Sequence, residues 1–169
     1  MLNDPLVSSV TSFGLGPRYL QVLQQSKVIV NKTHRLAKLR TILSTGSPMS
    51  SELYSFVKET IKHVFIQNVS GGTDICGGLV GGCQVLPVFT GVIQVPLLGV
   101  ALECWDEDGN QVAKGEQGDL VVTQRLPNMP LGLLGDDEKR SRLVATYYNH
   151  YKNVVVWYQG DHSTYTRGH

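Results

Sequence analysis

The sequence has few cysteines, and they are not spaced for metal binding or for paired disulfide bonds. Its three cysteines, Cys76, Cys83 and Cys104, form no Cys-x-x-Cys pair, so the ligand spacing of a zinc site is absent. An odd number of cysteines also gives no complete disulfide framework. We therefore expect reduced thiols in an intracellular, cytoplasmic protein.

The sequence also lacks an excess of charge of one sign and any long apolar run. The formal net charge of +1 gives no electrostatic basis for binding nucleic acid or an anionic membrane. No apolar run approaches the length that spans a bilayer, and Met1–Pro5 lack the basic region and apolar core of a signal peptide. The sequence thus predicts no nucleic-acid or membrane partner and indicates no partner protein.

The first half of the chain alternates helical and strand patterns. A short helix is predicted from Arg18 to Gln25, and a strand over 39–43 ends in the turn formers Ser44–Pro48. The next helix has Ser50 as its expected N-cap and carries an apolar stripe at three- and four-residue spacing: Leu53, Phe56, Val57, Ile61 and Val64. A second strand follows over 65–69. This order predicts a βαβ unit with parallel strands.

The second half changes to short alternating runs, which predict a small antiparallel sheet or partial barrel. The predicted strands are 92–95, 100–105, 118–123 and 154–157. Asp106–Asn110, with Asp-Gly at its centre, predicts a hairpin turn. The mixed-charge cluster Asp136–Arg142 predicts a solvated helix start or a loop, and both tryptophans, Trp105 and Trp157, are expected in the core.

The fold class expected from these patterns is α/β. We expect a βαβ part over residues 1–85, a β-rich, barrel-like subdomain over 86–125, and a connector with a final strand over 126–169. With 169 residues, 41% of them hydrophobic, the chain is long enough to bury a core of its own.

A glycine-rich segment follows the second strand, with the sequence Ser70-Gly71-Gly72-Thr73-Asp74. Glycines let a ligand approach the backbone closely, a threonine hydroxyl can donate to a phosphate oxygen, and an aspartate can hold Mg²⁺. This segment and the turn Ser44–Pro48 both follow carboxyl ends of parallel strands, where α/β sheets bind ligands. These residues predict a nucleotide site, and a surface turn with a solvated aspartate is the alternative.

Two further motifs complete an ordered set. They are Gly115-Glu116-Gln117-Gly118-Asp119-Leu120 and Tyr158-Gln159-Gly160-Asp161. Taken in order, the four motifs resemble the adenylate-forming superfamily of acyl-CoA synthetases, luciferases and peptide-synthetase adenylation domains. The Ser-Gly-Gly-Thr-Asp version is similar to its acetoacetate-specific branch. The resemblance runs from about Phe13 to Asp161.

The resemblance implies a role for each matching residue. Gly46, Ser47 and Pro48 would line the adenine and acyl end of a pocket, and Ser70, Gly71 and Gly72 would pass beside the adenine ring. Thr73 would bond the α-phosphate and Asp74 would hold Mg²⁺, which makes these two the expected catalytic residues. Asp161 would accept hydrogen bonds from the ribose hydroxyls. No role is assigned to His162, which we expect at the surface.

The activity that the resemblance implies is that of an acid–thiol ligase. Acetoacetate would be activated with ATP to an acyl-adenylate and then transferred to coenzyme A. A non-catalytic nucleotide-binding remnant is the alternative, and an unrelated α/β binding module is a third reading.

The sequence departs from the family pattern in three places. The phosphate-holding loop expected upstream of Phe13 is absent, and so is the lysine-bearing domain expected after Asp161. Gln159 stands where the branch usually has a histidine. The resemblance therefore implies a fragment, a truncated isoform or an incomplete gene model, and an isolated chain that does not turn over.

Overall fold

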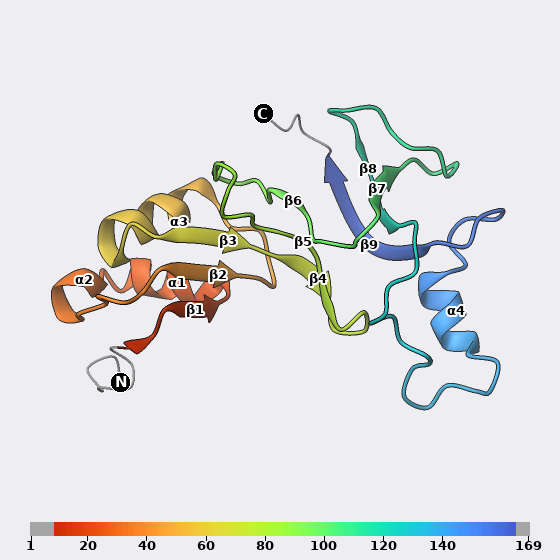
Figure 1. The fold of residues 1–169 in the computed structure, drawn as a ribbon, viewed down its shortest axis with the longest axis horizontal. Helices are drawn as coiled ribbons and strands as arrows, with labels where there is room; N and C mark the ends of the chain where they lie inside the picture. Colours follow the sequence, from red (N-terminus) through yellow and green to blue (C-terminus); the bar gives the residue numbers. More distant parts are fainter. Residues whose placement is uncertain (1–8, 165–169) are drawn as a thin grey trace. The chain divides into compact units, whose positions relative to one another are not determined.

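The computed structural model describes residues 9–164, which form two compact units. Unit 1 holds the described residues up to Ser70 together with Val80–Val95, and unit 2 holds Gly71–Leu79 together with the described residues from Pro96 onward. Figure 1 traces the chain through both units. The stretch Met1–Pro5, considered above for signal-peptide features, lies outside the described residues.

Unit 1 contains a parallel sheet, as predicted, with a third strand at Ser12–Leu15 that the sequence patterns did not predict. Its strands are β1 (Ser12–Leu15), β2 (Thr41–Ser44) and β3 (Phe65–Asn68), in the order β1-β2-β3. Ser44, the last residue of β2, pairs with Leu15 of β1 and with Asn68 of β3. All three strands therefore end at one edge of the sheet, and the segments after β2 and β3 leave it side by side.

The helices of unit 1 are α1 (Pro17–Gln25), α2 (Val30–Thr33), α3 (Ser51–Phe56) and η2 (Val57–Ile61). The predicted helix after Ser50 is present, but its second half is π-helical, which an apolar stripe does not reveal. Ser50 is the N-cap residue, yet its side chain makes no capping hydrogen bond. Its hydroxyl bonds the Glu52 carboxylate instead and lowers the pKa of that group.

The core of unit 1 lies between the helices and the sheet. Its apolar side chains come from the predicted helices and strands, and they include the buried residues Leu20, Ile42, Leu53, Val57 and Ile66. Burial of one such aliphatic side chain contributes about 1.5–3 kcal/mol. This packing stabilises the edge of the sheet from which the predicted site segments emerge.

Three short strands, β4 (Ser70–Gly72), β5 (Gly77–Gly81) and β6 (Val95–Pro96), follow in a second sheet. The glycine-rich segment is therefore a strand over its first three residues rather than a loop. Only glycine fits at position 71 of this strand, because a Cβ on Gly71 would lie 2.2 Å from the Gly77 carbonyl oxygen. The strand predicted over 92–95 is wrong for all but Val95.

Unit 2 contains an antiparallel sheet of β7 (Leu102–Trp105), β8 (Gln117–Val122) and β9 (Trp157–Thr164), with helix α4 (Ser141–Tyr147). The α/β class is confirmed. The predicted antiparallel sheet is present, and the described residues form no closed barrel. The core holds Leu79, Leu120, Val122 and Trp157, and both tryptophans are buried as predicted.

The last predicted strand begins later in the chain and runs further than expected. Val154 and Val155 are 42% and 81% exposed, and pairing with β8 starts only at Trp157. Three β-branched residues in a row resemble a strand, but none of Val154, Val155 and Val156 pairs with a partner strand among the described residues. Consequently Tyr158–Asp161 lies inside β9 and not at its end.

The charged cluster Asp136–Arg142, predicted as a helix start or a loop, is a loop that leads into α4, whose first residues are Ser141 and Arg142. Asp136 accepts from the backbone N–H groups of Arg142 and Leu143 at 2.9 and 3.0 Å, and Asp137 accepts from Ser141 at 2.8 Å. These bonds satisfy backbone donors in the first turn of α4. In the described part of the chain no helix is long and apolar enough to cross a membrane.

Candidate functional site

A hollow of about 200 Å³ lies within unit 2, where the glycine-rich segment meets α4 and β9. It is lined by Gly72, Thr73, Asp74, Ile75, Tyr147, Trp157 and Gln159. The structure therefore brings three residues of the predicted nucleotide motif to a concave surface. Four residues that sequence reasoning did not assign to the site form the rest of the wall.

The predicted catalytic residues, Thr73 and Asp74, lie in a tight turn after β4. Ile75 is fully buried and anchors the turn, and Asn128 donates from its side chain to the Ile75 carbonyl oxygen at 2.6 Å. The Cys76 N–H closes the turn on the Thr73 carbonyl at 3.0 Å. Thr73 and Asp74 are left exposed on a fixed backbone.

The Asp74 carboxylate is held from across the hollow by α4. The Tyr147 hydroxyl donates to Asp74 Oδ2, and this hydrogen bond, with burial, raises the pKa of Tyr147 to about 12. The phenol therefore stays protonated and remains a donor at neutral pH. Asp74 Oδ1 has no hydrogen-bond partner among the described residues, so one carboxylate oxygen is available to a ligand.

Trp157 connects the two sides of the hollow. Its ring, 1% exposed, stacks on Tyr147 with centroids 4.0 Å apart and planes at 8°. Its indole N–H donates to Gln159 Oε1 at 2.9 Å. The buried Trp157 ring thus holds in place both the Tyr147 phenol, which binds Asp74, and the Gln159 amide, which lies beside Gly72.

The donor set suits a magnesium ion only in part. Mg²⁺ is commonly held by one or two carboxylates together with substrate phosphates and water. Asp74 supplies one carboxylate, with one oxygen already bonded to Tyr147. In residues 9–164 no group of three His, Cys, Asp or Glu side chains forms a cation site. The site fits an ion that arrives with a phosphate ligand and not a resident ion.

The other predicted ligand residues are distributed between the units. Gly46, Ser47, Pro48 and Ser70 belong to unit 1, where Gly46 has a φ of 91° in the turn after β2. Two buried polar atoms at the same edge, Ser44 Oγ and Asn68 Oδ1, have no hydrogen-bond partner within residues 9–164. Gly71 and Asp161 belong to unit 2. Asp161 is exposed on β9 and is not among the residues that line the hollow.

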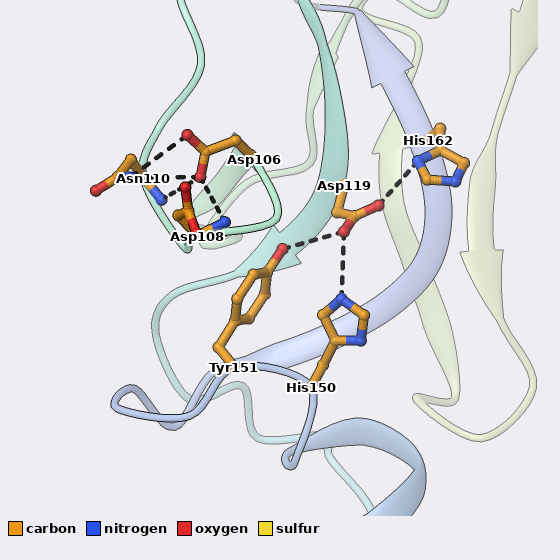
Figure 2. A network of polar contacts seen from close by, with 7 residues as sticks. All are labelled: Asp106, Asp108, Asn110, Asp119, His150, Tyr151 and His162. Atoms are coloured by element: carbon orange, nitrogen blue, oxygen red, sulfur yellow. Dashed lines mark hydrogen bonds and ion pairs between the residues drawn. The ribbon is translucent and has the colours of Figure 1, made fainter.

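A polar network around Asp119, which the sequence did not reveal, lies elsewhere in unit 2 (Figure 2). Asp119 is only 7% exposed. It pairs with His162 at 2.8 Å and His150 at 3.4 Å, and it accepts from the Tyr151 hydroxyl at 3.2 Å. Burial and Asp119 together raise the pKa of Tyr151. His162 is exposed at the surface, as expected, but it has a carboxylate partner.

Residues 6–130 match the family described as AMP-binding enzyme. The chain is 39% identical over 155 residues to acetoacetyl-coenzyme A synthetase of Rhizobium meliloti (strain 1021), which covers 91% of this chain and 23% of that protein. It is 38% identical over 154 residues to acetoacetyl-CoA synthetase of Gallus gallus, which covers 90% and 22%. The chain therefore spans less than a quarter of the length of these relatives.

Two solved structures have a similar fold. Acetoacetyl-CoA synthetase from Streptomyces lividans superimposes with a TM-score of 0.85 at 31% identity, over 95% of this chain and 25% of that one. The anthranilate CoA ligase AuaEII, solved in complex with anthranoyl-AMP, superimposes with a TM-score of 0.70 at 20% identity, over 91% and 27%. The second likeness concerns the fold alone.

Proposed function

Because the chain belongs to the AMP-binding enzyme family, we propose that it forms part of an acid–thiol ligase that joins acetoacetate to coenzyme A at the expense of ATP. The choice of acid rests on the identity with acetoacetyl-CoA synthetases. The observation that carries the proposal is the hollow in unit 2, where Gly72, Thr73 and Asp74 face a wall that holds the Asp74 carboxylate in place.

In the first half-reaction a carboxylate oxygen of acetoacetate bonds to the α-phosphorus of ATP, and pyrophosphate leaves. Two anions must approach, so their repulsion has to be offset. Thr73 would donate from its hydroxyl to the α-phosphate, and Asp74 would hold Mg²⁺ with its carboxylate. When it is bound, the ion neutralises phosphate charge. The Tyr147 hydroxyl keeps the carboxylate oriented.

The nucleoside is held by residues with little or no side chain and by one acid. Ser70, Gly71 and Gly72 would allow the adenine ring to approach the backbone, and Gly46, Ser47 and Pro48 are the residues proposed for the adenine and acyl end. Asp161, exposed on β9, accepts from the ribose hydroxyls. In the second half-reaction the coenzyme A thiolate attacks the acyl carbon, and AMP leaves. None of these steps needs a protein nucleophile, so positioning dominates.

The product is a thioester, the form in which acyl groups enter lipid metabolism. All three cysteines are free, which fits a reducing compartment, and we propose a cytoplasmic location.

Binding of adenine nucleotide to the 169-residue chain tests the proposal. Calorimetry is expected to detect weak binding of AMP and of ATP with Mg²⁺, and Asp161→Ala is expected to weaken both by removing the ribose contact. Asp108→Ala, an exposed acid on the Asp106–Asn110 turn, is the matched control. Absence of binding at millimolar nucleotide would contradict the proposed site in this chain.

A further inference from the structure

The side-chain amide of Gln159 has a fixed orientation. An indole N–H can only donate, and the one on Trp157 donates to Gln159 Oε1 at 2.9 Å. This contact assigns the oxygen of the amide to the Trp157 side and the nitrogen to the opposite side. Rotating the Gln159 amide by half a turn would place its Nε2 donor against the Trp157 N–H donor.

Trp157 itself has little freedom to move. It is 1% exposed, its face stacks on Tyr147, and Tyr148 meets it edge-on with ring centroids 5.6 Å apart. Stacked and edge-on aromatic contacts stabilise a fold by more than the burial of their apolar area alone. The orientation of the Gln159 amide is therefore set by the core and not by solvent.

The nitrogen of the amide faces the predicted nucleotide motif. Gln159 Nε2 lies 3.1 Å from the point that a Cβ on Gly72 would occupy, and both residues line the hollow with Thr73 and Asp74. Among the described residues, Nε2 has no acceptor. An amide with two N–H donors thus lines a hollow whose one charged wall residue is a carboxylate.

We infer that Gln159 is a specificity-determining residue that donates from Nε2 to an oxygen of the α-phosphate. The inference rests on the proposed function, since it assumes that an adenine nucleotide occupies the hollow. A neutral donor suits this place, because it recognises a phosphate oxygen without forming an ion pair with Asp74. Together with the Thr73 hydroxyl, it gives the α-phosphate a donor on each of two segments, the turn after β4 and strand β9.

The test is selectivity between AMP and adenosine, measured by ligand titration of the full chain in two-dimensional NMR spectra. Gln159→Glu keeps the shape and the acceptor for Trp157 but replaces the donor with a carboxylate. A hydrogen bond to a charged group is worth a factor of about 10 or more in affinity. We expect AMP to bind at least about 10-fold more weakly to this variant and adenosine to bind within about twofold of the unchanged chain.

Two further variants separate donor loss from other effects. Gln124→Glu adds the same charge at an exposed position outside the hollow and should leave both affinities within about twofold. Trp157→Phe keeps an aromatic ring but removes the N–H that orients the amide, so it should weaken AMP more than adenosine. Thermal unfolding followed by circular dichroism confirms that each variant is folded.

The outcomes distinguish the inference from the proposed function. If Gln159→Glu binds AMP as well as the unchanged chain does, or loses AMP and adenosine equally, Gln159 does not recognise phosphate and the inference is wrong while the nucleotide site stands. If the unchanged chain binds neither ligand at millimolar concentration, the proposed site and the inference both fail.

Discussion

The Tyr147 hydroxyl and the Asp74 carboxylate are hydrogen-bonded to each other across the hollow of unit 2. The two residues are 73 positions apart, and they come from helix α4 and from the turn after β4. The bond occupies one oxygen of the proposed metal ligand and couples the helix to the nucleotide motif. Its consequences for pH dependence and for ligand binding can be measured separately.

The raised pKa of Tyr147 predicts an alkaline loss of stability. An unperturbed tyrosine titrates near pH 10, and in the folded chain the pKa is raised to about 12. The folded state therefore holds this proton more tightly, so the stabilisation is complete below about pH 10 and is lost as the pH rises to about 12. Urea unfolding between pH 9 and pH 12 should show a smaller loss in Tyr147→Phe than in the unchanged chain. Equal losses would mean that Tyr147 titrates normally.

Asp74→Asn is expected to remove the magnesium dependence of ATP binding. The amide keeps an acceptor for the Tyr147 hydroxyl but lacks the negative charge that holds a divalent cation. ATP affinity measured by calorimetry with Mg²⁺ should fall by about 10-fold, which is a typical loss for one charged contact, while affinity measured with a chelator should stay unchanged. Asp108→Asn, on an exposed turn of the same unit, should alter neither value.

Local patterns were sufficient to predict part of unit 1, but not β1 or α2. Apolar spacing predicted α1 and the helix from Ser51, and the strand signals of 39–43 and 65–69 predicted β2 and β3 to within two residues. Turn formers then identified where the strands end. The π-helical half of that helix could not be predicted, since it is defined by a different hydrogen-bond spacing rather than by a different side-chain pattern.

The site was predictable only where its chemistry is carried by consecutive residues. Thr73 and Asp74 stand in one motif, whereas Tyr147 is brought to Asp74 by folding alone. The Asp119 network likewise joins β8 to residues of β9 and of the segment before it. The contact between Trp157 and Gln159 could have been predicted from the sequence. Residues two apart in a strand share a face, and Trp157 and Gln159 are hydrogen-bonded on one face of β9.

Gly71→Ala should destabilise the chain because the close approach of β4 to β5 leaves no room for a side chain. A Cβ there would lie 2.2 Å from the Gly77 carbonyl oxygen and 2.6 Å from the Gly78 Cα, and both are backbone atoms that cannot rotate away. Overpacking of this kind costs about 1–3 kcal/mol. Gly132→Ala, where nothing lies within 4 Å, is the control and should be neutral. The free energy of unfolding in urea gives both values.

Asp119→Asn should destabilise unit 2 and also lower the pKa of Tyr151. Asp119 is 7% exposed and contacts three partners, His150, His162 and Tyr151, so loss of its charge removes several charge-assisted hydrogen bonds at once. We expect the free energy of unfolding to fall by about 2 kcal/mol. The pKa of Tyr151 is raised by burial and by Asp119, so only the second contribution should disappear. Absorbance titration of the variant against the unchanged chain would reveal this partial decrease. An unchanged titration curve would mean that Asp119 does not raise the pKa of Tyr151, and that the carboxylate organises the histidines without acting on the phenol.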